Sequence, residues 1–304
     1  PGLEHPNPEF PEAFVRSIKL GKEIDADVLI ATDPDADRLG CAVRQPNGEY
    51  QLLTGNQIAS IMLAYILEAH KQAGTLPKNA AAVKSIVSTN FAAKIAESYG
   101  VEMINVLTGF KWIADQIHQY ETGKADHTFM FGFEESYGYL IKPFVRDKDA
   151  IQSLTLLAEV AAYYRSRKMT LYDGLQELFK KYGYFREKTV ANMYPGVDGP
   201  AKIQGLMKKF REEAPTDFAG HKVMVTEDFS KGTKTTADGQ VSELGIPESN
   251  VLRYILDDET WIAIRPSGTE PKLKFYIGTS APSLDEANSK LAAFEKALKE
   301  FAEE

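Results

Sequence analysis

The feature that most constrains the fold is a regular alternation of strand-like and helix-like segments in the middle of the chain. Short apolar runs there have the composition of buried strands, and the stretches between them carry apolar residues at helical spacing. Strands that alternate with helices form a mostly parallel sheet covered by helices. The predicted strands and helices are, in order, 82–87, 90–100, 101–107, 110–120, 128–133 and 150–165.

The chain is long enough for more than one domain. We expect residues 1–53 to hold a Pro-rich extended linker and the C-terminal part of one domain, and residues 54–183 to form an α/β domain. Residues 184–304 have a less regular pattern, which predicts a smaller α+β domain after a junction in the polar stretch that starts at Gly183. The predicted fold class is therefore α/β, a helix-covered, mostly parallel sheet followed by an α+β C-terminal domain.

Composition narrows the classes of partner. The formal net charge of −8, without a local block of Lys and Arg, argues against a nucleic-acid partner. No stretch is long and apolar enough to cross a membrane, and Cys41 is the single cysteine, so we expect no membrane association and a reduced, cytoplasmic setting. None of the five histidines has a spacing that assigns it to a metal.

Three aspartates, Asp33, Asp35 and Asp37, follow directly after an apolar run that predicts a short buried strand. Alternate residues of an extended segment point to one side, so the three carboxylates converge if the strand geometry continues into the loop. Carboxylates this close attract a hard divalent cation such as Mg²⁺, which prefers oxygen ligands. An EF-hand calcium loop is excluded because its sixth position is Arg38 rather than Gly and its twelfth is Arg44 rather than Glu. A solvated acidic turn remains the alternative.

The segment Gly132 to Gly138 lies at the end of a predicted strand, where ligands of parallel sheets bind. Its acidic residues and the hydroxyl of Ser136, bracketed by glycines, have the chemistry to bind the hydroxyls of a polyol. The alternative is an acidic turn in which Glu134 or Glu135 pairs with a nearby Lys or Arg.

A second candidate loop, Arg265 to Pro271, follows a predicted strand near the C-terminus. Arg presents a planar fork that matches phosphate oxygens, Ser267 offers a hydroxyl, and Gly268 permits a turn whose N–H groups face an anion. The alternative is a tight hairpin turn with a structural arginine.

The charged run from Arg146 to Asp149 precedes the predicted helix at 150–165. Arg146 and Lys148 have the length and charge to reach a phosphate, and Lys148 is a candidate for proton transfer if its pKa is lowered. A solvated charged loop is the usual outcome for such runs.

Taken together and in this order, these loops resemble those of the α-D-phosphohexomutase family, with the closest likeness to its bacterial phosphoglucomutase branch. Thr108-Gly109-Phe110-Lys111 also resembles an active-site loop of the family, and the matching loops together cover most of the chain from residue 25 to 277. Family members have four domains, and the resemblance implies that this chain holds the end of the second, the third and the fourth. The first carries a catalytic phosphoserine in a Ser-His-Asn-Pro type motif, which this sequence lacks.

The resemblance also implies roles for the site residues. The aspartates, with the phosphoserine as fourth ligand, bind Mg²⁺, and Arg38 and Lys148 are catalytic, with Lys148 moving a proton. Glu134 and Ser136 bind sugar hydroxyls, whereas the loop that starts at Arg265 binds the phosphate that does not react. The implied substrate-binding residues are Thr108, Gly109, Lys111, Glu134, Ser136, Arg146, Arg265, Ser267, Gly268, Thr269 and Lys274. Lys274 stands where many members have Arg, which replaces a bidentate fork with a point charge.

The resemblance implies an isomerase that interconverts glucose 1-phosphate and glucose 6-phosphate through glucose 1,6-bisphosphate. We expect these 304 residues to be inactive without the first domain, since the phosphoserine is the phosphoryl donor. Mannose or pentose phosphates are alternative substrates within the family. A non-catalytic module that binds sugar phosphates is the alternative from another class.

Overall fold

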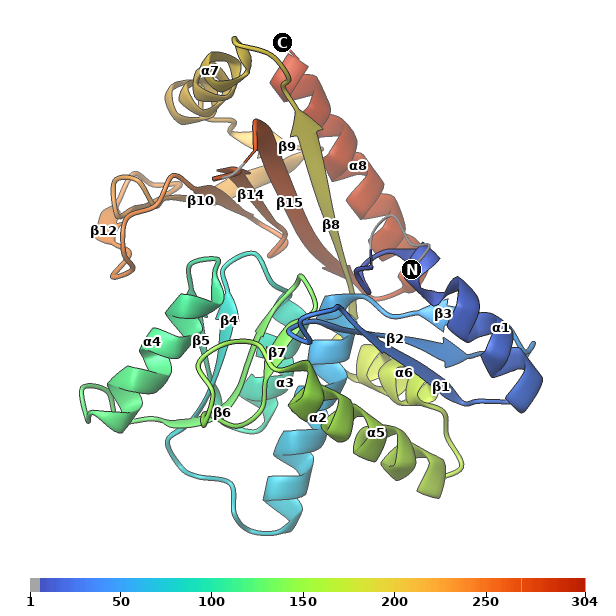
Figure 1. The fold of residues 1–304 in the computed structure, drawn as a ribbon. Coiled ribbons are helices and arrows are strands. Elements are labelled where there is room, and N and C mark those ends of the chain that lie inside the picture. Colours follow the sequence, from blue (N-terminus) through green and yellow to red (C-terminus); the bar gives the residue numbers. More distant parts are fainter. Residues whose placement is uncertain (1–5, 269, 304) are drawn as a thin grey trace. The chain divides into compact units, whose positions relative to one another are not determined.

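The computed structural model describes residues 6–268 and 270–303. The chain divides into an N-terminal unit, Pro1–Tyr182, and a C-terminal unit, Gly183–Glu304. Each unit contains its own sheets and its own buried apolar cluster (Figure 1).

The N-terminal unit begins with two short helices and a small antiparallel sheet in the order β1-β2-β3. A Pro in the first turn starts η1, and a left-handed Asp25 ends α1. The elements are η1 (Pro11–Phe14), α1 (Val15–Ile24), β1 (Val28–Thr32), β2 (Leu39–Arg44) and β3 (Tyr50–Leu52).

Residues 6–13 differ from the predicted extended linker, because they are folded against this sheet. Phe10 N donates a hydrogen bond to the Asn7 carbonyl at 3.1 Å, and Pro8 is buried. Gly40 of β2 allows the approach, since a Cβ there would lie 2.7 Å from the Pro8 carbonyl oxygen. The turn Asn7–Phe10 is thus docked on β2.

Asn56 has the residue type of a helix N-cap, but the helix α2 (Gly55–Gln72) already begins at the residue before it. Thr54 caps it instead, accepting a hydrogen bond from Gln57 N while the Gln57 side chain accepts from Thr54 N. Asn56 is buried, and its side-chain oxygen accepts a hydrogen bond from Thr89 N at 3.1 Å.

The second sheet of this unit has the order β5-β4-β6-β7. Both neighbours of β4 are parallel to it, as the alternating pattern predicts, while β7 adds an antiparallel edge. The helix α4 packs on one face and α2 and α3 lie on the other (Figure 1). The elements are β4 (Ala80–Ser85), α3 (Asn90–Ser98), β5 (Glu102–Val106), α4 (Phe110–Glu121), β6 (Thr128–Glu134) and β7 (Gly138–Leu140).

Two further helices complete the N-terminal unit, α5 (Ala150–Ser166) and α6 (Leu171–Tyr182). Asp149 caps α5, since its Oδ1 accepts hydrogen bonds from Ile151 N and Gln152 N. Both helices pack against the small sheet, so α5 starts beside the loop that joins β1 to β2.

The C-terminal unit is built on an antiparallel sheet in the order β12-β11-β10-β13-β14-β15-β8, with β9 paired to β10. The helices α7 (Gly199–Glu212) and α8 (Leu284–Glu303) contribute Phe210 and Phe294 to its buried cluster. The strands are β8 (Tyr184–Met193), β9 (Asp217–Phe218), β10 (His221–Asp228), β11 (Thr233–Thr236), β12 (Val241–Glu243), β13 (Leu252–Leu256), β14 (Trp261–Pro266) and β15 (Lys272–Ala281).

The polar stretch after Gly183 forms β8, and β8 pairs with β15 along its whole length, from Tyr184 opposite Ala281 to Met193 opposite Lys272. A strand with one exposed face carries polar residues, which explains why its composition resembles that of a junction. Among the helices in the described ranges, none combines the length and apolar character that a membrane crossing requires.

Candidate functional site

The three aspartates converge through a tight turn rather than through an extended strand. Ala36 has a left-handed backbone with φ of 58°, and its N–H donates to the Asp33 carbonyl at 3.1 Å. The Asp33 side chain closes the turn, because its Oδ1 accepts hydrogen bonds from Asp37 N and Arg38 N at 3.0 Å each. As a result Asp33, Asp35 and Asp37 each offer a carboxylate oxygen, and these oxygens lie within 4.8 Å of one another.

The electrostatics of this turn fit a cation. Burial raises the pKa of Asp33, and the charges of Asp37 and Asp35 add to the rise. The Oδ1 atom of Asp37 is buried and has no hydrogen-bond partner among the described residues. Three converging oxygen ligands with one oxygen unsatisfied are the donor set that a hard divalent cation such as Mg²⁺ prefers.

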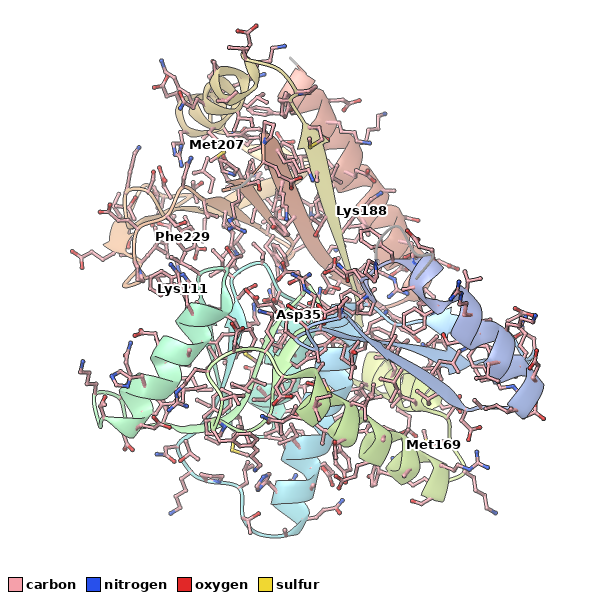
Figure 2. All side chains as sticks on the ribbon, viewed as in Figure 1. Asp35, Lys111, Met169, Lys188, Met207 and Phe229 are labelled. Carbon is pink, nitrogen blue, oxygen red and sulfur yellow. The ribbon has the colours of Figure 1, made fainter. Side chains whose placement is uncertain are left out.

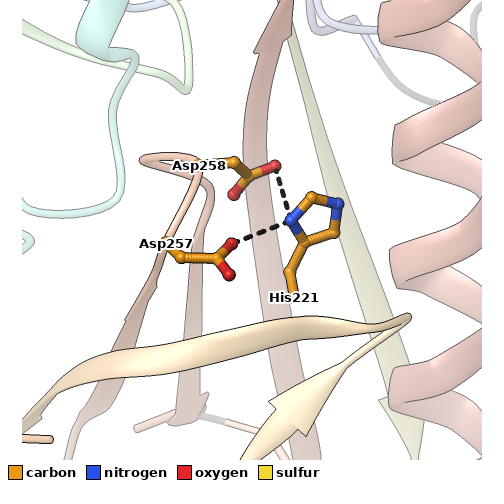
Figure 3. A group of neighbouring side chains, drawn as sticks. All are labelled: His221, Asp257 and Asp258. Carbon is orange, nitrogen blue, oxygen red and sulfur yellow. Dashed lines mark hydrogen bonds and ion pairs between the residues drawn. The ribbon is translucent and has the colours of Figure 1, made fainter.

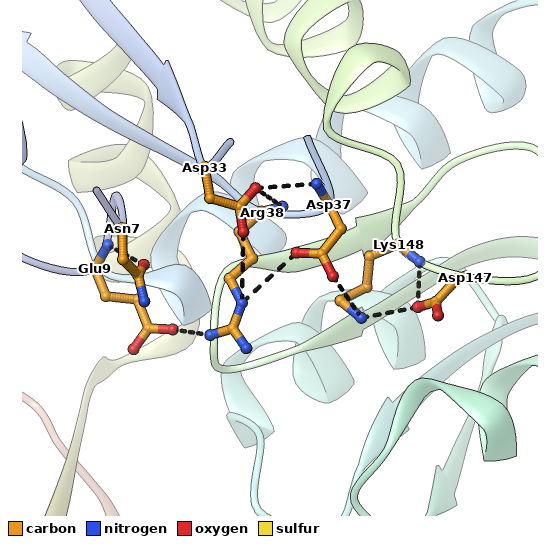
Figure 4. Close-up of polar contacts among 7 residues, drawn as sticks. All are labelled: Asn7, Glu9, Asp33, Asp37, Arg38, Asp147 and Lys148. Atoms are coloured by element: carbon orange, nitrogen blue, oxygen red, sulfur yellow. Dashed lines mark hydrogen bonds and ion pairs between the residues drawn. The ribbon is translucent and has the colours of Figure 1, made fainter. Parts of the chain in front are cut away.

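Two basic side chains flank the aspartates (Figure 4). Arg38 Nε lies 3.7 Å from Asp37 Oδ1 and 3.9 Å from Asp33 Oδ2. Lys148 Nζ lies 3.0 Å from Asp37 Oδ2 and 2.8 Å from Asp147 Oδ1. The turn therefore combines acidic ligands for a cation with two cations that suit a phosphate group.

Backbone hydrogen bonds join this loop to the loop between β6 and β7 and to the start of α5. Leu39 N donates to the Tyr137 carbonyl and Ala150 N donates to the Ala36 carbonyl, each at 3.0 Å, and Arg38 pairs with Gly138 in an isolated bridge. Gly138 also leaves space for a neighbour, because a Cβ there would lie 2.3 Å from Lys148 Cδ. The two loops and Lys148 are thus held as one structure.

Burial alone lowers the pKa of Lys148, but its hydrogen bonds to Asp147 and Asp37 outweigh burial, so the pKa is raised. The ammonium also lies over the Phe110 ring, 5.5 Å from its centroid. Lys148 is therefore a protonated cation in this arrangement, which differs from the lowered pKa that a basic role needs.

Glu134 is buried at the end of β6, and its Oε1 accepts a hydrogen bond from Gly109 N at 2.6 Å. Burial raises the pKa of Glu134, and the charge of Glu135 adds to the rise. This contact brings together the two loops at the carboxyl ends of β5 and β6. Thr108 is half-buried in the same loop, and Ser136 is half-buried beside Glu135.

Glu135 has a structural role that the sequence did not reveal. Its Oε2 accepts hydrogen bonds at 3.0 Å from the hydroxyls of Ser85 and Ser88, and its N–H donates to Ser88 Oγ. The buried ammonium of Lys84 caps the turn between these serines through the Ser88 carbonyl, at 3.0 Å. A buried Lys in a strand is a signal for such a network, because a buried charge requires partners.

Two predicted residues lie away from the aspartate turn. Arg146 is exposed and pairs with Glu121 and with the Pro143 carbonyl. Lys111, in the first turn of α4, is exposed (Figure 2). Its Nζ lies over the Trp112 ring, 4.8 Å from the centroid. The described contacts of both side chains are thus with neighbours other than the aspartates.

In the C-terminal unit, Arg265 and Lys274 are directly opposite in the β14–β15 register. Residues directly opposite in an antiparallel pair share a face, where like charges destabilise the pair unless an anion neutralises them. Neither has an ion-pair partner in the described part of the chain, and Ser267 N donates to the Lys272 carbonyl at 2.8 Å to close the turn. Gly268 is exposed, and Thr269 lies outside the described residues.

A second group of potential ligands occurs in the same unit (Figure 3). His221 Nδ1 lies 2.9 Å from Asp257 Oδ1 and 3.5 Å from Asp258 Oδ2. Lys290 Nζ, however, lies 2.7 Å from Asp258 Oδ2 and already supplies a cation there. This group has the contacts of a structural ion-pair cluster.

Three family models match the chain. They are Phosphoglucomutase/phosphomannomutase alpha/beta/alpha domain II over residues 1–48, alpha/beta/alpha domain III over residues 54–182, and the C-terminal domain over residues 203–297. The residues described above in the aspartate turn, the β6–β7 loop and the β14–β15 hairpin lie within these matches.

Curated relatives support the same grouping. The chain is similar to a phosphoglucomutase of Staphylococcus epidermidis, with 43% identity over 280 residues, which cover 92% of this chain and 50% of the relative. It is 39% identical over 293 residues to a phosphoglucomutase of Staphylococcus aureus, covering 96% of this chain and 51% of the relative. The chain thus spans about half the length of the curated relatives it matches.

Solved structures share the fold. The phosphoglucomutase parafusin from Paramecium aligns with a TM-score of 0.65 at 19% identity, over 98% of this chain and 50% of that one. A Phosphoglucomutase/phosphomannomutase family protein from Burkholderia thailandensis aligns with a TM-score of 0.62 at 20% identity, over 99% and 52%.

Proposed function

The chain belongs to the phosphoglucomutase/phosphomannomutase family, and from this membership we propose that it forms the metal-binding and sugar-phosphate-binding part of a phosphohexomutase. The proposed enzyme interconverts glucose 1-phosphate and glucose 6-phosphate. The observation that carries the proposal is the turn in which Asp33, Asp35 and Asp37 converge between Arg38 and Lys148.

The aspartates are the proposed ligands of a divalent cation, with Mg²⁺ as the ion. When bound, such an ion neutralises charge on a phosphoryl group in transfer. A related solved structure, the Aspergillus fumigatus N-acetylphosphoglucosamine mutase, is a complex with GlcNAc-6P and magnesium. The magnesium belongs to that related protein, and its presence there supports the choice of Mg²⁺ for this chain.

Arg38 and Lys148 are the proposed catalytic residues. The guanidinium of Arg38 has donors that match phosphoryl oxygens. Its Nε lies 3.7 Å from Asp37 Oδ1, so a phosphoryl group bound beside Asp37 would be close to these donors. In the transfer, the phosphorus–oxygen bond to the donor breaks and a bond to the sugar hydroxyl forms. We propose that the protonated ammonium of Lys148 gives its proton to the donor oxygen that leaves, and that the amine so formed takes up the proton lost by the sugar hydroxyl.

Glu134 and Ser136 are the proposed sugar-binding residues, and Thr108, Gly109, Lys111 and Arg146 the residues that border the sugar. The Gly109 N–H already occupies one oxygen of Glu134, which fixes the carboxyl at the carboxyl ends of the parallel strands. A buried carboxyl held in this way discriminates strongly between a hydroxyl that it can bind and one that it cannot.

For the C-terminal unit we propose that the β14–β15 hairpin binds a phosphate group. Arg265 and Lys274 supply the charge, and Ser267, Gly268 and Thr269 are the further residues proposed to bind the phosphate. The position of these two cations directly opposite each other supports this role. Their repulsion destabilises the hairpin, and an anion bound between them would remove that repulsion.

The phosphoryl donor is proposed to be a phosphoserine outside these 304 residues, since the sequence contains no Ser-His-Asn-Pro motif. Turnover of glucose 1-phosphate, mannose 1-phosphate and ribose 1-phosphate by the full-length protein tests the function and its two alternatives within the family. Turnover of glucose 1-phosphate alone or fastest supports the proposal. No turnover of any of the three, by a folded full-length protein, refutes it.

Turnover distinguishes the proposed enzyme from the alternative of another class, a binding module without chemistry, whereas calorimetry tests the phosphate-binding hairpin under both hypotheses. Both hypotheses predict that glucose 1-phosphate binds and that Arg265→Ala weakens the binding. Lys208→Ala is the matched control, since it removes an exposed cation of α7 in the same unit. Binding without turnover in the full-length protein favours the module.

A further inference from the structure

The turn Asn7–Phe10 forms one wall of the space beside the aspartates. An open pocket of about 350 Å³ is lined by this turn and by the aspartate loop. Its lining residues are Pro6, Asn7, Phe10, Asp33, Pro34, Asp35, Asp37 and Arg38. Two contacts hold the turn, because Pro8 packs on Gly40 and the Asn7 side chain accepts a hydrogen bond from Glu9 N at 3.0 Å.

From this wall the Glu9 carboxylate reaches Arg38 and accepts a hydrogen bond from its Nη1 (Figure 4). Both side chains are about two-thirds buried, so this ion pair is shielded from solvent more than a surface pair. Burial raises the pKa of Glu9, and the charge and hydrogen bond of Arg38 oppose the rise. The Arg38 guanidinium thus favours the ionised form of the Glu9 carboxyl, and the two side chains form an ion pair.

The guanidinium of Arg38 lies between two sets of acids. On one side Glu9 holds Nη1, and on the other Nε stays 3.7 Å from Asp37 Oδ1 and 3.9 Å from Asp33 Oδ2. Those distances exceed a hydrogen bond, and Asp37 Oδ1 is left without a partner. An arginine released from Glu9 has five donors with which to form the bidentate contact that carboxylates favour.

We propose that Glu9 is a positioning residue that holds Arg38 away from Asp33 and Asp37, so that these carboxylates stay available to a divalent cation. The inference rests on the cation site of the proposed function. Without Glu9, Arg38 forms direct hydrogen bonds with the aspartates and competes with the cation for the same oxygens. Glu9 also leaves the guanidinium in place beside Asp37, where a phosphoryl group is proposed to bind.

The experiment is a titration of the 304-residue chain with Mn²⁺, followed by water-proton relaxation, which detects weak sites. We expect Glu9→Ala to weaken Mn²⁺ binding about tenfold, which matches one gained charge-assisted hydrogen bond between Arg38 and the aspartates. Glu12→Ala is the matched control, because it removes an exposed carboxylate three residues along the same segment and is expected to change the affinity less than twofold. Glu9→Gln, which loses the charge and keeps an oxygen that accepts from Nη1, is expected to recover part of the affinity.

A double-mutant cycle separates positioning from a simple effect of charge. In the background of Arg38→Gln, Glu9→Ala is expected to change the Mn²⁺ affinity less than twofold. The same tenfold loss in that background, or an unchanged affinity of Glu9→Ala in the wild-type background, overturns the inference and leaves the cation site standing. No Mn²⁺ binding by the folded wild-type chain overturns the cation site and the inference together.

Discussion

Gly138→Ala tests whether the position of Lys148 depends on the missing side chain of its neighbour. An added Cβ would lie 2.3 Å from Lys148 Cδ and 2.7 Å from Cγ, whereas carbon atoms in contact are about 3.5–4.0 Å apart. The Lys148 stem must therefore move by more than 1 Å (roughly the difference between these distances). That movement breaks the contacts of Nζ with Asp37 at 3.0 Å and Asp147 at 2.8 Å.

The magnitude follows from the burial of these groups. Lys148 is only 14% exposed, so each lost contact is worth more than that of a surface pair, and we expect a total cost of about 1–2 kcal/mol. For a unit of this size that cost lowers the melting temperature by roughly 2–8 °C, measurable by circular dichroism. Gly205→Ala is the control, because nothing lies within 4 Å of its added Cβ and the helix α7 gains up to about 1 kcal/mol from the change.

The same substitution in a chain that already carries Lys148→Ala tests the reasoning. Lys148→Ala removes the Cγ and Cδ atoms that clash, so Gly138→Ala is expected to be nearly neutral in a Lys148→Ala chain. An equal loss of stability in both backgrounds would show that the glycine is required for another reason.

Three further predictions concern other contacts. Gly55→Ala is expected to destabilise the N-terminal unit by about 2 kcal/mol or more in urea unfolding, because the added Cβ would lie 2.2 Å from the backbone oxygen of Glu135. An unchanged free energy of unfolding would contradict the tight packing of α2 on that loop. Glu134 has a folded pKa raised above 4.5, so the folded state keeps a proton that the unfolded state has released, and stability relative to Glu134→Gln is expected to fall as the pH rises from 4.5 through the folded pKa. A pH-independent difference between these two chains would refute the assignment. Burial opposes ionisation of Asp258, but hydrogen bonds from Lys290 and Thr260 N outweigh it and lower the pKa below 3.8, so Asp258→Asn is expected to cost about 1–2 kcal/mol at neutral pH. That cost is lost as the pH falls from 3.8 through the folded pKa, and a cost that persists at lower pH would contradict the account.

The parallel sheet of the N-terminal unit was predictable, since its strands and helices alternate with clear periodicity. The strands β7 and β8 were not. β7 has three residues, too few for a pattern, and β8 is identified only by its pairing with β15. In helix α1 the residue that is buried is Gly21, where a Cβ would lie 2.8 Å from Leu29 Cδ2, whereas Val15 and Leu20 are exposed. A hydrophobic pattern cannot indicate a face that packs through a glycine.

For the site, the sequence identified the acidic loop and its order among the other loops, because local residue types carry that information. It did not identify Glu9, which lies in a Pro-rich stretch that resembles a linker, and it did not indicate that Asp33 closes the turn by accepting two backbone hydrogen bonds. Both depend on contacts between segments distant in sequence, or on a left-handed residue at Ala36 that composition does not predict.

Turnover of glucose 1-phosphate by full-length Asp35→Asn tests directly whether the three aspartates bind the catalytic cation. Asp35 is exposed and makes no hydrogen bond or ion pair in the described ranges, whereas Asp33 closes the turn and Asp37 pairs with Lys148, so Asp35→Asn leaves the fold intact. We expect a loss of turnover on the order of a hundredfold or more, partly restored by higher Mg²⁺, because a cation ligand is removed. Asp115→Asn, on the exposed face of α4, is expected to retain full turnover. Wild-type turnover by Asp35→Asn at limiting Mg²⁺ would contradict the claim that the three aspartates bind the catalytic cation.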